Sequence, residues 1–506
     1  MHQSIEIVIS NGLLTVTPFP EYLKKPLSFY ELVTVMKPFE YRDKSGKLCS
    51  GERKDGYENK LRPLFTEIES TGGAVTHRGL FRRIHNLILE NGDTPRISRK
   101  CTLPSFVFGR EVVEGLLEEQ QRVLLNVLGE IGTGQVGWEK NPFLVQPHPG
   151  SGGALVEATM STGKTFIIAA LIKCFPHVNV LVVTKKVSVI NRLVSGLSEI
   201  IKTEPIGVFF GLKKQPQRVT VCSEALLSSF DTNQIGLIIY DEVHNSSGEV
   251  VSSILLQFDR SVKIGLSATL SNHKKKKFIE SIFGPIVDTI DDEEADQKNL
   301  VAPVKVYALH IDRGPDISGH VETGLERWGI TRNSHRNKLI AQIVERVPEH
   351  MQLIIFVRTI DHIEELMSKL PPGFSVYHGQ LSGPERSRVE AGIISGELKR
   401  IVANDALSEG VNTTKLRVMI EAGWSINDET VSQRAGRNRR KDDGKKMGII
   451  ITMLDDWEIK GDVEGLSKTN PLKQRAASRL RVYEKRKWPV LKIKKIDEID
   501  FSEIED

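Results

Sequence analysis

Residues 154–172, ALVEATMSTGKTFIIAALI, decide the fold class of this chain. An apolar, β-rich run leads into a loop that ends in Gly163, Lys164 and Thr165, and an apolar helical stretch follows. The loop has the spacing GxxxxGK[ST] of a phosphate-binding P-loop, with Ala158 in place of the usual first glycine. A strand, a loop and a helix in this order predict an α/β domain with a nucleotide bound at the carboxyl edge of its sheet.

The residue types of this loop suit a nucleoside triphosphate. Backbone N–H groups of the loop and of the helix N-terminus bind phosphate oxygens, and Lys164 reaches the β- and γ-phosphates. The Thr165 hydroxyl is expected to ligate Mg²⁺. A chance GKT before a helix is the weaker alternative. We therefore expect ATP and Mg²⁺ as cofactors, with a loop made of Ala158, Met160, Ser161, Thr162, Gly163, Lys164 and Thr165.

A second apolar run ends in two carboxylates. Residues 235–247 read IGLIIYDEVHNSS, so Asp241 and Glu242 stand where a buried strand would end. Asp241 is expected to hold Mg²⁺ through water, and Glu242 to act as the general base for the attacking water. An acidic pair after a strand is usually a solvated loop, but the P-loop upstream favours the catalytic interpretation.

The same alternation of short apolar runs and amphipathic stretches covers residues 154–269 and returns over residues 305–454. Such alternation indicates parallel sheets with helices on both faces, so the chain is predicted to be α/β with two such domains, hinged near residues 300–306. The predicted boundaries are 1–105 for a small N-terminal domain, 106–300 for the first lobe, 301–455 for the second lobe and 456–506 for a basic helix with an acidic tail.

The other segments differ in composition. Residues 1–105 combine strand-like runs with two helical-looking stretches, 27–37 and 79–92, which predicts a small α+β module. Residues 131–153 are rich in Gly and Pro and are expected to form a surface insertion. The acidic end of the chain, residues 494–506, is expected to be disordered.

Composition favours a globular protein of the cytoplasm. Hydrophobic residues make up 39% and charged residues 26% of the 506 residues, and the formal net charge is +4. A mildly basic charge permits a polyanionic partner without requiring one. The start of the chain has no signal-peptide pattern, and no apolar run is long enough to cross a membrane. The four cysteines are widely spaced, which favours reduced thiols: Cys49, Cys101, Cys174 and Cys222.

Four motifs in order resemble those of superfamily 2 helicases. The P-loop and the DEVH sequence that begins at Asp241 match motifs I and II, residues 267–269 (SAT) match motif III, and residues 433–440 (QRAGRNRR) match motif VI. The resemblance runs from Gln120 to about Asp455 and implies two RecA-like lobes that hydrolyse ATP in the cleft between them. It also implies nucleotide contacts by Gln433 and Gly410, and arginine fingers at Arg437 and Arg440.

Weaker matches complete the predicted site. Gln120 or Gln121 stands where the family has a glutamine that reads adenine, and the residues leave this choice open. The family contacts the nucleic-acid backbone at positions that match Thr184, Ser223, Ser267, Thr269, Arg358, His378 and Asn404. Asn404 and Asn412 depart from the threonine and aspartate that are usual in the family.

The second lobe and the DEVH motif most resemble the DNA-directed branch that contains UvsW-type, RecG-like and XPB-like motors. Residues 60–88 loosely resemble the small N-terminal DNA-binding module of UvsW-type proteins. The resemblance implies an ATP-dependent DNA helicase that binds single-stranded and branched DNA, such as forks and junctions. It also implies a role in phage replication, recombination or repair, and a monomeric protein in the host cytoplasm.

Three alternatives remain at this stage. An RNA helicase or RNA-dependent ATPase would be stimulated by RNA, and the motor subunit of a restriction-type complex would translocate on duplex DNA without separating strands. A DNA-binding scaffold without turnover is disfavoured because it has no need of Lys164, Glu242, Arg437 and Arg440 together.

Basic patches allow two interpretations each. The run Lys274–Lys277 is either a solvated face or a grip on duplex phosphates through Lys274 and Lys275. Arg82, Arg83 and His85 either face DNA or lie on an ordinary surface. The basic helical stretch 472–488 carries an apolar stripe and is expected to pack on the second lobe.

Overall fold

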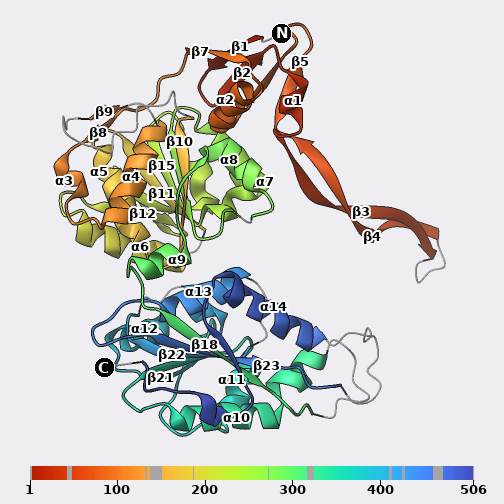
Figure 1. Ribbon diagram of the computed structural model, residues 1–506, viewed down its shortest axis with the longest axis vertical. Coiled ribbons are helices and arrows are strands. Elements are labelled where there is room, and N and C mark those ends of the chain that lie inside the picture. Colours follow the sequence, from red (N-terminus) through yellow and green to blue (C-terminus); the bar gives the residue numbers. More distant parts are fainter. Residues whose placement is uncertain are drawn as a thin grey trace. The chain divides into compact units, whose positions relative to one another are not determined.

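The computed structural model describes residues 3–42, 48–131, 134–136, 151–185, 187–271, 273–315, 324–409, 413–423, 428–459 and 471–504. The chain divides into two compact units, Met1–Ala158 with Gly163–Thr289 and Thr159–Thr162 with Ile290–Asp506. Each unit is described by itself (Figure 1). No helix of the described residues is both long and apolar enough to cross a membrane.

The first unit contains an eight-stranded sheet in the order β13-β12-β14-β11-β15-β16-β10-β17. Its strands are β10 (Gly153–Ala158), β11 (Asn179–Thr184), β12 (Ile206–Phe210), β13 (Lys213–Gln215), β14 (Val219–Ser223), β15 (Ile235–Asp241), β16 (Val262–Ser267) and β17 (Ile286–Ile290). The pairs that join β12, β14, β11, β15, β16 and β10 are parallel. Every residue of β10, β15 and β16 is buried, which explains why these runs are largely apolar.

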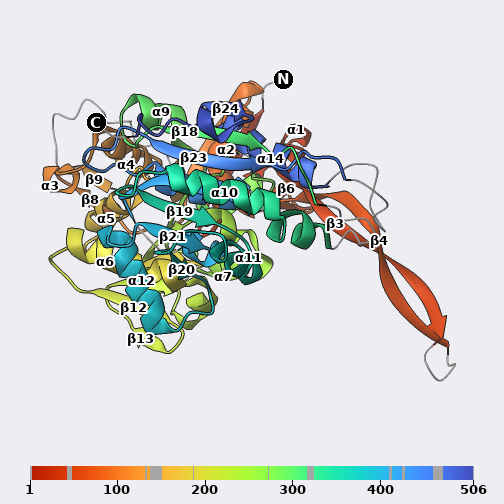
Figure 2. The same cartoon turned by 90° about the horizontal axis from the view of Figure 1, so that it is seen from below.

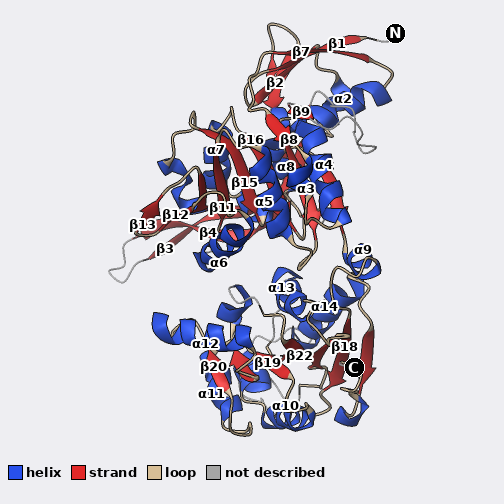
Figure 3. Ribbon diagram, turned by 90° about the vertical axis from the view of Figure 1, so that its left-hand side faces the viewer, coloured by secondary structure: helices blue, strands red, loops and turns tan. Residues whose placement is uncertain are grey.

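Helices cover this sheet, with α4 and α5 on one face and α7 and α8 on the other (Figures 1 and 3). The helices of this lobe are α3 (Arg110–Val113), α4 (Glu118–Ile131), α5 (Lys164–Cys174), α6 (Val187–Ile200), α7 (Glu249–Gln257) and α8 (Lys276–Phe283). Because the strands are parallel, the ends of β10, β11, β14, β15 and β16 meet at one edge.

The N-terminal module is a five-stranded mixed sheet in the order β5-β6-β2-β1-β7, packed against one helix. Its elements are β1 (Ser4–Ile9), β2 (Leu13–Thr17), α1 (Glu21–Lys24), β5 (Phe65–Ile68), β6 (Gly73–His77), α2 (Phe81–Glu90) and β7 (Thr94–Arg99). Alternate residues of β1 are buried in a core that also contains Phe81, Ile84 and Ile88 of α2. The predicted small α+β module and its second helix are confirmed.

A long hairpin replaces the first helix predicted in this module. Residues 27–37 were expected to be helical, but β3 (Ser28–Arg42) pairs antiparallel with β4 (Leu48–Pro63). Among the described strands these two pair only with each other, and they leave the N-terminal sheet as a separate ribbon (Figures 1 and 2). The helix prediction was wrong because aromatic and β-branched residues, such as Val33, Thr34 and Val35, favour a strand.

Arg78 anchors the N-terminal module to the first lobe. Its side chain is 4% exposed and donates to four backbone carbonyls, those of Ser151 (2.9 Å), Gly152 (3.4 Å), Asp259 (3.4 Å) and Ser261 (3.3 Å). Each carbonyl is thereby satisfied without water.

The neighbouring arginines have the same role. Arg82 binds Glu130 of α4 at 2.9 Å, and Arg83 binds Glu280 of α8. Both arginine side chains stay partly exposed, at 43% for Arg82 and 34% for Arg83, while their guanidinium groups pair with lobe 1 carboxylates. A DNA contact by these residues stays a prediction.

The second unit contains a fully parallel seven-stranded sheet in the order β20-β21-β19-β22-β23-β18-β24. Its strands are β18 (Val304–His310), β19 (Gln352–Phe356), β20 (Ser375–Tyr377), β21 (Arg400–Ala403), β22 (Leu416–Glu421), β23 (Gly448–Leu454) and β24 (Val490–Ile493). Its helices are α9 (Asp292–Gln297), α10 (Ser334–Arg346), α11 (Ile360–Met367), α12 (Gly383–Ser395), α13 (Asp428–Asn438) and α14 (Pro471–Lys485). Two parallel-sheet lobes with a small mixed-sheet module confirm the predicted fold class.

The C-terminal segment packs on the second unit. Helix α14 buries Leu472, Ala476, Leu480 and Tyr483 in that unit, as the apolar stripe predicted. The acidic tail, expected to be disordered, is ordered as far as residue 504. The prediction was wrong because apolar residues interrupt the acidic ones, and Ile499, Phe501 and Ile504 are buried in the core of the lobe. The predicted insertion 131–153 lies largely outside the described residues.

A buried lysine in β16 predicts a pH effect on stability. Lys263 donates to the carbonyl of Phe258 at 2.6 Å, and burial together with nearby Arg78 lowers its pKa from 10.5 to about 7. Between these two values the unfolded chain binds a proton that the folded chain has released, so the free energy of unfolding rises with pH.

We expect Lys263→Met to remove this rise, which is up to about 1.4 kcal/mol per pH unit. The measurement is the melting temperature of both proteins from pH 7 to pH 9.5. Parallel curves for the two proteins would contradict the assignment.

Candidate nucleotide and nucleic-acid site

The phosphate loop joins the end of β10 to the start of α5. Ser161 and Gly163 have φ values of 69° and 81°, a left-handed backbone that turns successive N–H groups toward one point. Thr162 Oγ1 closes the loop on itself by donating to the carbonyl of Thr159 at 2.8 Å. Ala158 is fully buried at the end of the strand, so the small residue in place of glycine fits.

The structure distinguishes the two glutamines of α4. The Gln120 side chain accepts from the backbone N–H of Leu117 at 3.1 Å, and its Nε2 lies so close to Gly163 that a Cβ there would be 2.3 Å away. The Gln121 amide instead donates to the carbonyl of Leu116 at 2.9 Å. Gln120 is therefore the glutamine beside the phosphate loop.

Lys164 connects the loop to β15. Its Nζ lies 3.0 Å from Glu242 Oε1, and the lysine side chain is 15% exposed. Burial by itself lowers the pKa of Lys164, but the carboxylates of Glu242 and Asp241 outweigh it and raise the pKa above its usual value. The lysine is thus a fixed positive charge where phosphates are expected.

Asp241 fits a magnesium ion. Burial and the adjacent Glu242 raise its pKa, and its Oδ1 is buried without a hydrogen-bond partner among the described residues. A buried carboxylate oxygen without a donor matches the oxygen ligands that Mg²⁺ prefers. With the hydroxyl of Thr165 at the start of α5, the residues present fit the ion.

A hydrogen-bonded chain links motif II to motif III. Glu242 has a left-handed backbone with a φ of 56°, a strained conformation common at functional sites. The ring of His244 lies 2.8 Å from Ser267 Oγ through Nδ1 and 3.0 Å from Asn245 Nδ2 through Nε2. Ser267 Oγ also accepts from the N–H of Thr269 at 3.3 Å. The sequence pattern indicated no separate role for His244, and only its neighbours in the folded chain reveal this one.

The nucleic-acid residues predicted in the first lobe lie at the same sheet edge. Thr184 and Ser223 end β11 and β14, and the register places them directly beside each other. Both are buried, at 3% and 8% exposure, so their contacts to a ligand would use little of their surface. Ser267 is fully buried, and Thr269 is half-buried.

The predicted residues of the second lobe also share one edge. Arg358, His378 and Asn404 follow the parallel strands β19, β20 and β21. The N–H of Asn404 donates to the carbonyl of Tyr377 at 3.1 Å, which draws the ends of β20 and β21 together. Gly410 lies outside the described residues.

Motif VI lies on α13. Arg434 is fully buried, where it binds Glu421 and Asp405 and lies 4.9 Å from the ring of Phe356. This inward arginine fixes the helix against β22.

The two predicted arginine fingers, Arg437 and Arg440, differ in exposure. Arg437 is 5% exposed and Arg440 is half-buried beyond the end of the helix. Arg439, for which no role was predicted, binds Asp292 and Asp296 of α9. Gln433, four residues before Arg437 on α13, is half-buried. Within this unit Ser161 Oγ donates to the carbonyl of Gly436 at 3.1 Å.

The run Lys274–Lys277 has contacts that the sequence did not anticipate. Lys275 Nζ lies 3.3 Å from Glu31, and Lys277 donates to the carbonyl of Ser28 at 3.0 Å. Lys274 is exposed. Phosphate contacts by Lys274 and Lys275 stay predictions.

Substitution of Glu242, the predicted general base, gives one direct test of this site. Because an amide cannot take a proton from the attacking water, Glu242→Gln should lower ATP turnover by about a hundredfold or more while ATP still binds. The measurement pairs steady-state ATPase with binding of a fluorescent ATP analogue. Glu249→Gln, an exposed carboxylate at the start of α7, is the matched control. Equal turnover in Glu242→Gln and the parent would reject the assignment.

Two sequence families match the chain. The family described as Type III restriction enzyme, res subunit, matches residues 114–272, which contain motifs I to III. The family described as helicase conserved C-terminal domain matches residues 335–442, which contain motif VI.

Similar proteins include helicases of different kinds. The chain is 23% identical over 323 residues to a DNA 3'-5' helicase XPB of Kineococcus radiotolerans, and the match covers 60% of this chain and 57% of that protein. The structure of S. cerevisiae Dbp5 bound to RNA and ADP BeF3 has a TM-score of 0.52 at 15% identity, covering 78% of this chain and 96% of that one. T4 UvsW matches with a TM-score of 0.38 at 15% identity over 97% of this chain and 99% of that one.

Proposed function

The chain belongs to helicase superfamily 2, and on this premise we propose that it is an ATP-dependent DNA helicase or translocase. The observation that carries the proposal is the arrangement at one sheet edge of the first lobe. Lys164 and Glu242 lie 3.0 Å apart there, beside a buried Asp241 oxygen without a partner among the described residues. A binding scaffold has no need of this arrangement.

Each residue of the site has a proposed role in hydrolysis. Lys164 binds the β- and γ-phosphates, and Glu242 takes a proton from the attacking water. Thr165 and Asp241 would hold Mg²⁺, which neutralises charge on the phosphates when bound. Gln120 is the proposed adenine reader, since its amide lies beside Gly163.

Motif VI supplies the remaining positive charge. Arg437 and Arg440 are the proposed arginine fingers, which stabilise the charge that develops on the γ-phosphate. Arg434 is instead a positioning residue, because its guanidinium is buried against Glu421 and Asp405.

Nucleic-acid contacts are proposed along both sheet edges. Backbone phosphates of one strand would meet residues from the two lobes, and such contacts position a strand without reading its sequence. The proposed residues are Thr184, Ser223, Ser267, Thr269, Lys274, Arg358, His378 and Asn404.

We further propose forked or branched DNA as the substrate and a monomer as the active form. The support is the N-terminal module with its separate β3–β4 ribbon, a shape that fits the major groove of a DNA arm. A role in phage replication, recombination or repair belongs to the same proposal.

The deciding experiment measures ATPase rate and strand separation on a panel of substrates: no nucleic acid, single-stranded DNA, duplex, forked DNA, a four-way junction and RNA. Stimulation and unwinding on forks or junctions support the proposal. Stimulation by RNA alone would make the chain an RNA-dependent ATPase, and stimulation by plain duplex without unwinding would make it a translocase.

A further inference from the structure

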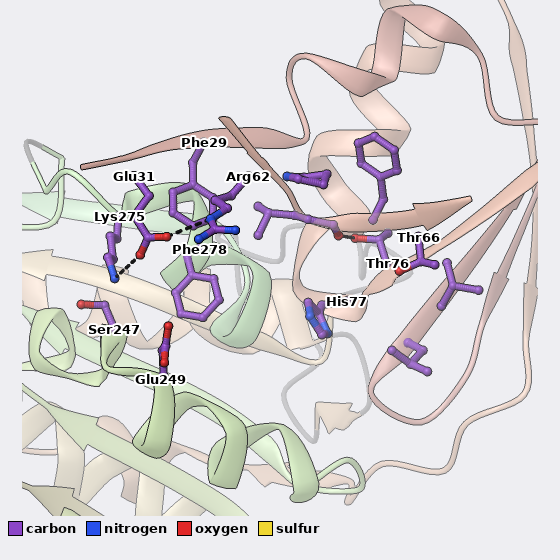
Figure 4. A pocket seen from close by; sticks show the side chains of 15 residues that line it. Phe29, Glu31, Arg62, Thr66, Thr76, His77, Ser247, Glu249, Lys275 and Phe278 are labelled. Atoms are coloured by element: carbon purple, nitrogen blue, oxygen red, sulfur yellow. Dashed lines mark hydrogen bonds and ion pairs between the residues drawn. The ribbon is translucent and has the colours of Figure 1, made fainter. Parts of the chain in front are cut away.

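The segment that follows motif III contacts the first residues of the β3–β4 hairpin. Lys275 Nζ lies 3.3 Å from Glu31 Oε1 near the start of β3, and Lys277 Nζ donates to the carbonyl of Ser28 at 3.0 Å. Figure 4 shows the Lys275 and Glu31 side chains pointing toward each other. We call Ser28–Glu31 together with Arg62 the hairpin root. Ser28 and Glu31 are therefore both held by lysines that lie six to eight residues after the SAT motif.

An aromatic contact supports the same junction. Phe278 of α8 packs against the core of the first lobe and also against the core of the N-terminal module. Its ring centroid lies 5.7 Å from that of Phe29 in the hairpin root. Figure 4 shows the two side chains beside each other. A side chain shared by two cores transmits displacement of one to the other, because packed interiors are poorly compressible.

Charge complementarity makes the junction specific. Glu31 lies between Arg62 at 3.0 Å and Lys275 at 3.3 Å, and these two cations hold the pKa of Glu31 below its usual value. Burial lowers the pKa of Lys277, which faces the module rather than solvent. Lys275 and Lys277 of the lysine run therefore form contacts within the protein.

The same segment is bound at its other end to the nucleotide site. Ser267 Oγ meets His244 of motif II at 2.8 Å, and the N–H of Ser271 donates to Glu157 of β10 at 3.1 Å, one residue before Ala158. Between these points and α8 the backbone forms hydrogen-bonded turns, including His273 to Leu270 at 2.9 Å. Seven residues lie between Ser267 and Lys275. Among the described ones, hydrogen bonds are made by Thr269, Leu270, Ser271 and His273.

We propose that the β3–β4 hairpin takes part in strand separation. Its position is coupled to the nucleotide site through the Glu31–Lys275 ion pair and the Phe29–Phe278 contact. The inference rests on the proposed function, which it deepens. Glu31, Lys275 and Phe278 are positioning residues: they touch neither nucleotide nor phosphate in this role. Strand separation depends on them, whereas ATP hydrolysis does not.

The test uses Glu31→Gln, Lys275→Gln and the double variant in the full-length protein. The readouts are DNA-stimulated ATPase, base pairs separated per ATP on forked DNA, and DNA affinity. Glu31→Gln should keep its ATPase within about twofold, and each single variant should lose about fivefold in base pairs separated per ATP, the lower range of coupling between sites. The double variant should lose no more than either single one, because both remove the same pair. Glu58→Gln, an exposed carboxylate of β4, is the control for the change in charge.

If Lys275 instead binds a DNA phosphate, the two variants should change DNA affinity differently. Glu31→Gln would then free the lysine and tighten DNA binding, while Lys275→Gln would weaken it. Opposite signs for the two variants, or unwinding equal to that of the parent protein, would overturn the inference.

A second readout separates this inference from the proposed function. Hydrogen exchange of the root amides, residues 28–31, should change when an ATP analogue binds the parent protein, and should not change in Glu31→Gln. A response to nucleotide without any DNA-stimulated ATPase would reject the proposed function and keep the coupling. Exchange that ignores the nucleotide in the parent protein would reject the coupling even if the chain unwinds DNA.

Discussion

Lys164→Ala should lower ATP turnover by about a thousandfold, within the range found when one donor to a transition-state charge is removed. The lysine is the only side chain of the loop's GKT sequence that carries a charge, and its ammonium lies 3.0 Å from Glu242. Without it the γ-phosphate would approach two carboxylates, Asp241 and Glu242, with no compensating cation from the loop. DNA binding should be largely retained, since the predicted contacts lie on other strands.

The measurement is ATPase rate over a DNA titration, with DNA affinity measured separately by fluorescence anisotropy. Lys173→Ala is the matched control, because this lysine is exposed in the last turn of the same helix, α5. A variant that hydrolyses ATP at the parent rate would remove the phosphate-site assignment. Loss of DNA binding together with turnover, at an unchanged melting temperature, would place Lys164 in a different role.

Arg78→Met should have the largest effect on stability, a loss of about 3–5 kcal/mol, as expected when one member of a buried polar network is removed. Four backbone carbonyls accept from this guanidinium, and methionine can donate to none of them. The carbonyls of Ser151 and Gly152 lie just before β10, while those of Asp259 and Ser261 lie just before β16. The substitution should therefore loosen the N-terminal module and the start of both strands.

Thermal unfolding and limited proteolysis measure this effect. The melting temperature should fall, and cleavage should increase between the N-terminal module and α4. Arg96→Met, at an exposed position of β7, is the control for the loss of one arginine. If the two variants unfold alike, the four carbonyl contacts do not stabilise the junction.

The two lobes and most of the nucleotide site were predictable because their signals are local. A buried parallel strand must be apolar along its length, and a phosphate loop needs a small residue, a lysine and a hydroxyl at set spacings. The strands that end at Ala158 and Asp241 could therefore be predicted from the local sequence. Parallel pairing then brings their carboxyl ends together, whatever the details of packing.

Other predictions failed where a local pattern had two outcomes. Residues 27–37 are amphipathic enough for either a helix or a strand, and the partner strand β4 selects the strand. The acidic tail has the charge of a disordered segment, yet its few apolar residues find a core. In both cases a partner outside the segment decides its structure.

What the sequence alone determined is the α/β class, the motor motifs and the set of side chains proposed to bind phosphates, because these depend on residue type and spacing. Only the tertiary structure decided how charges are paired. It placed Gln120 rather than Gln121 beside the loop. It also bonded Arg78, Arg82 and Arg83 to the first lobe and paired Lys275 with Glu31. The physical reason is that a charged side chain is long and flexible, so its partner is chosen by distance in the folded chain.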